Sequence, residues 1–144
     1  MDDDDKVHRI WLVLKVGLGA LAFVAGLDKF LNLMTYWPGY VAEPFARLMP
    51  FSTQTFMYAV GVVEMLVGLA ILTKLTRLGA YVMTAWLGCI ALNLIAAGMF
   101  DIAARDVAMA LGAFSLAQLT EVLHGVPAAR REIRTVPRPA HAAT

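Results

Sequence analysis

Long apolar stretches separated by short polar segments dominate the chain. Four of these stretches each approach the roughly 20 residues that a helix needs to cross a bilayer. They lie at about residues 10–27, 55–73, 78–97 and 107–123. The polar hinges at 74–77 and 98–106 are short, and short connections favour antiparallel neighbours. The pattern therefore predicts an all-α membrane protein, with four transmembrane helices in an antiparallel bundle.

The connection between the first two predicted helices, residues 28–54, is much longer than the others. Its three prolines prevent a continuous helix from passing through it, and it is rich in aromatic side chains. One interpretation is an external, interfacial segment with an aromatic belt. The other is a lid or partner-docking surface that uses Trp37, Tyr40 and Phe45. The two interpretations are compatible.

The composition agrees with a membrane protein, because 60% of the residues are apolar, 16% are charged and the mean hydropathy is +0.67. A soluble domain is typically about 45–50% apolar and about 25% charged. Residues 1–6 end in four aspartates and a lysine, as an enteropeptidase-type cleavage sequence does, and are expected to be a tag remnant. Residues 7–124 then form the transmembrane domain. Residues 125–144 form a basic, Pro/Ala-containing cytoplasmic tail suited to anionic lipid headgroups.

Lysine and arginine are distributed unevenly between the two ends of the predicted bundle. The end that holds both termini would carry Lys6, Arg9, Lys74, Arg77, Arg130, Arg131, Arg134 and Arg138. The opposite end would carry Lys29, Arg47 and Arg105. Because basic residues concentrate in cytoplasmic loops, both termini are expected to be cytoplasmic.

Glu64 lies in the middle of the second apolar stretch. An acidic residue at a helix centre costs roughly 2.5–3.5 kcal/mol to insert, and such residues usually face the bundle interior and mark function. Gly61 and Gly68 flank Glu64 on nearly the same face, so its carboxylate should point towards a neighbouring helix. A pair with Lys15 of the first helix is sterically reasonable, although Lys15 could instead extend to the interface. Glu64 is then either a packing residue or a proton-accepting or ligand-orienting group.

A second polar cluster is expected at the external end of the bundle. Asp28 and Lys29 end the first helix, Asn93 lies in the outer half of the third, and Arg105 with Asp106 begins the fourth. These side chains could form an outer polar cluster beneath the aromatic segment, in which Asp28, Lys29 and Asn93 are the candidates for ligand binding or proton relay. They could equally be ordinary helix-end charges and interhelical hydrogen bonds.

The sequence lacks the residues that several kinds of redox and metal site require. The single cysteine, Cys89, excludes a dithiol cycle within the chain. None of the three histidines lies well inside a predicted span, so a transmembrane bis-histidine haem is not expected. No zinc-type spacing of cysteine and histidine occurs, and nothing indicates nucleic-acid binding. No metal site is predicted.

Two ordered sets of residues carry a family resemblance. In the first helix the order is Lys15, Gly19, Gly26 and Lys29. In the second helix and the turn after it, the order is Glu64, Gly68, Lys74 and Arg77. Over residues 7–123 the chain thereby resembles the DoxX/DoxD-like family of small four-helix bacterial membrane proteins.

The chain departs from the family pattern at two places. The fourth helix of the family often ends in a glycine-rich Ser-Leu-Asp motif, whereas here Gly112 and Ser115-Leu116 remain and Ala117 replaces the acid. Lys15 also stands where arginine is more usual, and lysine cannot pair bidentately with a carboxylate.

The resemblance implies a location in the bacterial inner membrane and a link to redox chemistry. Some members are similar to quinone-linked subunits of thiosulfate oxidation, and others are associated with oxidative-stress complexes. By that resemblance, the protein is expected to be a membrane subunit of a quinone-linked redox complex, with Glu64 and Lys15 lining an intramembrane polar pocket. A quinone is the candidate cofactor, and a second copy or a redox protein is the candidate partner.

Two other functions remain compatible with the residues. The first is a non-enzymatic assembly or stabilising protein that docks a membrane partner through Trp37, Tyr40 and Phe45. The second is a small proton-coupled transporter in which Glu64 relays protons.

Overall fold

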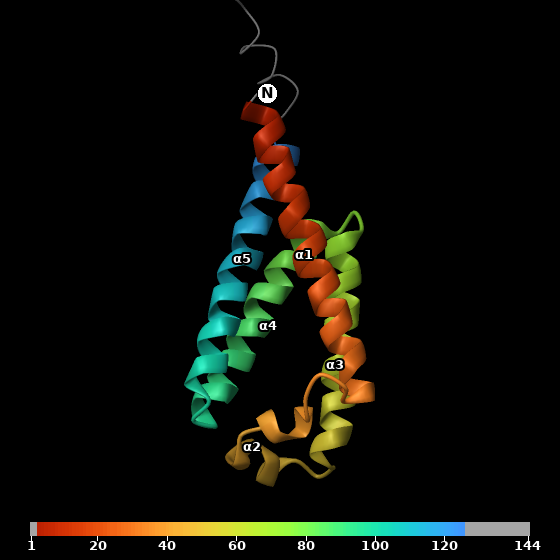
Figure 1. Ribbon diagram of the computed structural model, residues 1–144, viewed down its shortest axis with the longest axis vertical. Coiled ribbons are helices and arrows are strands. Elements are labelled where there is room, and N and C mark those ends of the chain that lie inside the picture. Colours follow the sequence, from red (N-terminus) through yellow and green to blue (C-terminus); the bar gives the residue numbers. More distant parts are fainter. Residues whose placement is uncertain (1–2, 126–144) are drawn as a thin grey trace, which may run out of the picture.

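The computed structural model describes residues 3–125, and every regular element within that range is helical (Figure 1). The elements are α1 (Asp3–Leu31), η1 (Trp37–Tyr40), α2 (Glu43–Leu48), α3 (Thr53–Leu72), α4 (Thr76–Ala96) and α5 (Phe100–His124). Four of them, α1, α3, α4 and α5, are long and apolar enough to cross a membrane. Consecutive long helices run in opposite directions (Figure 1). The predicted all-α four-helix membrane fold is confirmed.

Helix α1 begins at Asp3, well before residue 10, where the apolar pattern starts. Three aspartates occupy its first turn, where negative charge interacts favourably with the helix dipole, and Lys6 pairs with Asp3 at 3.0 Å. Residues expected to be a tag remnant thus extend the first helix. Its other end is closed by Asn32, which adopts the left-handed conformation (φ 50°) and donates its N–H to the Asp28 carbonyl at 2.6 Å.

Helix α5 begins at Phe100, so the hinge predicted at 98–106 is wrong. A tight turn with Gly98 at φ 76° ends α4, and the N–H of Met99 bonds the Leu94 carbonyl at 2.9 Å. The charged residues that suggested a hinge are therefore helical. Arg105 and Asp106 lie well inside α5, and they do not begin it.

The long helices pack mainly as two pairs, α1 with α3 and α4 with α5. Glycines allow the backbones of α1 and α3 to touch: a Cβ atom added to Gly26 would lie 2.6 Å from the Gly61 carbonyl oxygen, and one added to Gly68 would lie 2.7 Å from the Gly19 carbonyl oxygen. Small residues serve this purpose at membrane helix interfaces. The prediction that the face of Gly61 and Gly68 meets a neighbouring helix is confirmed.

The apolar core joins the two pairs only towards one end of the bundle. We call the end where α1 begins and α5 finishes the terminal end, and the end that carries η1 and α2 the loop end. The core cluster includes Leu18, Ile71, Met83, Leu116 and Ala117. Towards the loop end the pairs diverge, and η1 and α2 cross beneath them (Figure 1). The predicted tail lies outside the described residues, apart from Gly125.

Candidate functional site: a polar cavity within the bundle

A cavity of about 1060 Å³ lies in the half of the bundle nearer the loop end, between the two helix pairs. All four long helices and the segment between α1 and α3 contribute to its wall. Most lining residues are apolar, among them Met34, Met57, Val60 and Leu87. The polar and polar-tipped lining side chains are Lys29, Thr35, Trp37, Tyr40, Glu64, Trp86, Asn93, Arg105 and Asp106. Ligand sites commonly combine apolar walls with a few convergent polar groups.

An ion pair between α1 and α3 is the polar centre of this cavity. Lys29 Nζ donates to Glu64 Oε2 at 2.5 Å, and the two side chains are 5% and 11% exposed. Each residue follows a contact glycine by three positions, Gly26 on α1 and Gly61 on α3. The glycine contact therefore brings the two side chains within reach. A buried charge without a partner is costly, so the pair allows both groups to remain inside the bundle.

Trp37 covers the ion pair from the loop side. Lys29 Nζ lies 3.8 Å from the centroid of the Trp37 ring, the geometry of a cation–π contact. The Trp37 indole N–H donates to Asp28 Oδ2 at 2.7 Å. Asp28 also accepts from the backbone N–H groups of Leu33 and Met34 at 3.1–3.2 Å. These partners occupy the Asp28 carboxylate, so its role here is to hold the segment after α1.

Asn93 fastens the same segment to α4. Its amide nitrogen donates to the Tyr40 carbonyl at 2.7 Å, and its amide oxygen accepts from the Ala42 N–H at 3.0 Å. The three predicted docking residues, Trp37, Tyr40 and Phe45, all line the cavity. Only Phe45 is largely exposed, at 51%. The segment therefore closes the loop end of the cavity from within.

Lys15 does not pair with Glu64, and it does not line the cavity. Its Nζ donates to the Thr73 carbonyl at 3.0 Å and lies 4.8 Å from the centroid of the Trp11 ring. The cause is helix register: the contact of Gly19 with Gly68 sets Lys15 against the end of α3, where a cation interacts favourably with carbonyl groups. The expected Lys15–Glu64 pair is replaced by Lys29–Glu64.

Comparison with known protein families shows which family the chain belongs to. A family model described as DoxX matches residues 10–97, which is more than half of the chain. The chain belongs to the DoxX family. The DoxX match contains Lys29, Glu64 and Asn93, but it ends before α5, whereas the resemblance noted above extended to residue 123. No curated protein and no solved structure matches the chain.

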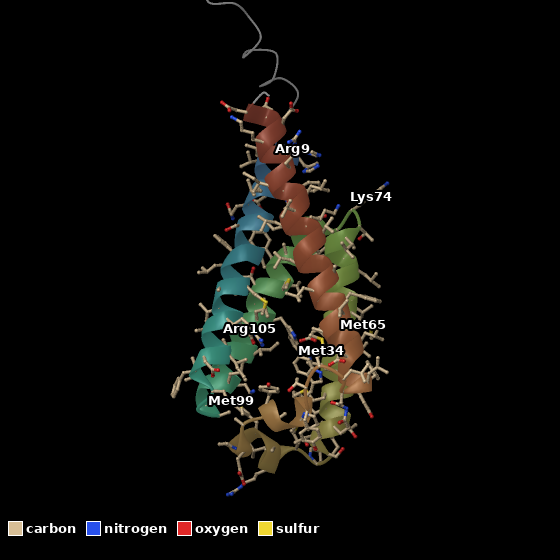
Figure 2. The ribbon with its side chains drawn as sticks, viewed as in Figure 1. Arg9, Met34, Met65, Lys74, Met99 and Arg105 are labelled. Carbon is tan, nitrogen blue, oxygen red and sulfur yellow. The ribbon has the colours of Figure 1, made fainter. Side chains whose placement is uncertain are left out.

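Trp86, Arg105 and Asp106 line the cavity but were not among the candidate site residues, although the sequence placed Arg105 and Asp106 in the external polar cluster. Arg105 and Asp106 belong to α5, beyond the DoxX match, and Arg105 lies beside the space between the helix pairs (Figure 2). Asp106 is 5% exposed and interacts electrostatically with Lys29 and Glu64. The available signal was the apolar content of residues 99–104, which would have placed Asp106 inside a helix.

The arrangement suits the binding of an amphipathic molecule within a DoxX bundle. The apolar walls accept a hydrocarbon tail, while Lys29 is a donor and Glu64 and Asp106 are acceptors for a polar head. Among the described residues, no group of three or more His, Cys, Asp or Glu side chains could hold a metal ion. Lys29, Glu64 and Asp106 offer hydrogen bonds and charge to a ligand.

Proposed function

We propose that this DoxX-family protein is the membrane subunit of a quinone-linked redox complex, with the quinone head bound beside Lys29 and Glu64. The observation that carries the proposal is the buried ion pair inside a large, apolar-walled cavity. The family is associated with redox-related roles in membranes, which supports the same function. This support is by family analogy, and the buried ion pair in the apolar-walled cavity is a second, independent support.

The cavity has the properties that a lipid-soluble quinone requires. A quinone head carries carbonyl acceptors, and Lys29 is a donor at the polar centre. The cavity also reaches the outside of the bundle, because Leu21 on α1 and Leu92 on α4 line it and are 45% and 68% exposed. A hydrophobic tail can therefore leave the cavity between helices and continue into lipid.

The proposed setting is the bacterial inner membrane, with the terminal end of the bundle in the cytoplasm. Arg9 and Lys74 lie at that end, opposite Met99 (Figure 2). In a Cys89→Ser background, a cysteine at Lys74 should react with an impermeant maleimide only after the cytoplasmic side is opened. A cysteine at Arg47 should react from outside in intact cells. The reverse labelling pattern would overturn this orientation.

The proposed function is tested by identifying the small molecules that stay bound to the protein during purification. After purification from its native membrane in mild detergent, mass spectrometry should find a quinone in near-stoichiometric amount. The double variant Lys29→Met/Glu64→Gln should lose most of it, because the variant removes the head contacts without leaving an unpaired ion. Glu43→Gln is the matched control, since Glu43 pairs with Arg47 on the exposed surface of α2. Retention of quinone by the double variant would contradict the site.

A second candidate function rests on the surface around α2. Tyr36, Phe45 and Leu48 are 70%, 51% and 81% exposed, which favours contact with another membrane protein or with the bilayer interface. A non-enzymatic assembly role is the function to adopt if the purified protein retains only lipid, or a partner without redox chemistry. A quinone in the same preparation would argue against it.

A further inference from the structure

Asp106 differs from the other buried carboxylates near the loop end of the bundle. Asp28 accepts hydrogen bonds from Trp37 and from two backbone N–H groups, and Glu64 accepts one from Lys29. The Asp106 side chain is only 7% exposed and lines the cavity, yet no hydrogen bond to it occurs within the described residues. Its one ion pair there, with Arg105 Nε, spans 3.6 Å, which is too long for a hydrogen bond.

Arg105 is a poor partner for this carboxylate. Adjacent positions on a helix do not face each other, and the Arg105 side chain is 63% exposed, so solvent or lipid headgroups compete for its charge. Asp106 is therefore a largely buried acceptor whose desolvation is offset only by a long contact with the exposed Arg105. Such a group in a ligand cavity points to a hydrogen-bond donor on the ligand.

Trp86 provides a complementary group in the same cavity. Its indole nitrogen is buried and has no hydrogen-bond partner within 3.5 Å among the described residues, and it interacts only weakly with the Glu64 carboxylate. Buried polar groups are rarely left without partners. The cavity thus presents an acceptor on α5 and a donor on α4, in addition to the Lys29–Glu64 pair. A head that satisfies both must itself carry a donor and an acceptor.

These groups distinguish the two redox forms of a quinone. Both oxygens of the oxidised form are acceptors, so a carbonyl placed against the ionised carboxylate of Asp106 would be repelled. A hydroquinone can donate one hydroxyl proton to Asp106, while its other oxygen accepts from Trp86 or Lys29. Building on the quinone-linked function above, we infer that Asp106 forms a subsite for a hydroquinone hydroxyl, and that the cavity binds the reduced form more tightly than the oxidised form.

Cys89 provides a direct measure of binding, because it is the only cysteine, is exposed and lines the cavity. The probes are a decyl dimethoxy-methyl benzoquinone and its hydroquinone, supplied anaerobically to the purified full chain. The ring of this quinone has no free position, so the thiol does not add to it. For each form we compare the concentration that halves the rate of Cys89 alkylation. This concentration should be about tenfold lower for the hydroquinone than for the quinone, as expected for one hydrogen bond to a charged acceptor.

Asp106→Asn should bring the two half-protecting concentrations together, because an amide can donate to a carbonyl as well as accept from a hydroxyl. Asp101→Asn is the matched control, since Asp101 is an exposed residue in the first turn of α5 and does not line the cavity. It should keep the tenfold difference. A difference that persists in Asp106→Asn would overturn the subsite.

The remaining outcomes separate this inference from the proposed function. Equal protection by both forms in the unaltered protein would overturn the preference and leave the quinone-linked function standing. Protection by neither form would overturn both. If Asp106→Asn does not fold, the dimethyl ether of the hydroquinone decides, because it lacks the donor: it should bind no better than the quinone, and tight binding would contradict the role of Asp106.

Discussion

Replacing Lys29 with methionine should lower the stability of the bundle by about 3–5 kcal/mol, because it leaves the Glu64 carboxylate buried without its partner. Glu64 is 9% exposed, and the Lys29 ammonium donates a hydrogen bond to its carboxylate. Thermal unfolding in detergent micelles should show a clear fall in Tm. The surface variant Arg47→Met, which breaks an exposed ion pair with Glu43, should change Tm little.

A double-mutant cycle separates the ion pair from the other effects of the Lys29 substitution. The variant Lys29→Met/Glu64→Gln removes both charges, and replacing a buried ion pair by neutral groups is often nearly neutral for stability. The double variant should therefore recover most of the Tm lost in Lys29→Met. If the two single effects simply add in the double variant, the two side chains are not energetically coupled.

Gly26→Ala should also be strongly destabilising, since the new Cβ atom would lie 2.6 Å from the Gly61 carbonyl oxygen and 2.9 Å from the Met65 backbone nitrogen. Neither contact can be relieved by rotating a side chain, so α1 and α3 must separate. Overpacking of this kind typically costs about 1–3 kcal/mol. The loss should be visible as a lower Tm.

Gly17→Ala is the control for the Gly26 substitution. It lies in the same helix, and a Cβ atom added to Gly17 would meet nothing within 4 Å. Because alanine is favoured over glycine inside a helix by about 0.5–1 kcal/mol, Tm should stay the same or rise slightly. A fall as large as that of Gly26→Ala would show that close backbone contact is not what makes position 26 sensitive.

The features that could be predicted from the sequence are those that depend on local pattern. Apolar stretches of spanning length predicted four helices, and Glu64 was identified because a carboxylate inside such a stretch is costly wherever its partner lies. The glycines beside it correctly predicted a face turned towards another helix. Each of these predictions needs only one helix and the energetics of burial.

The partner of Glu64 depends on register between two helices. Lys15 and Lys29 both lie on α1 about four turns apart, and only the contacts of Gly19 with Gly68 and of Gly26 with Gly61 decide which lysine faces Glu64. The position of Asp106 was predicted wrongly for a different reason. The charged residues between 101 and 106 suggested a polar hinge before the fourth helix, but α5 already includes them. Charge alone does not distinguish a solvated turn from a cavity wall.

The pairing of α1 with α3 has a consequence for how the protein is made. Lys29 and Glu64 belong to α1 and α3, which leave the ribosome before α4 and α5, and the contact between them includes close glycine backbone contacts and this ion pair. Their charges can neutralise each other once both helices are inserted, before α4 and α5 are synthesised. The Lys29–Glu64 pair therefore does not depend on the synthesis of α4 and α5, whereas Asp106 joins the pair only with α5.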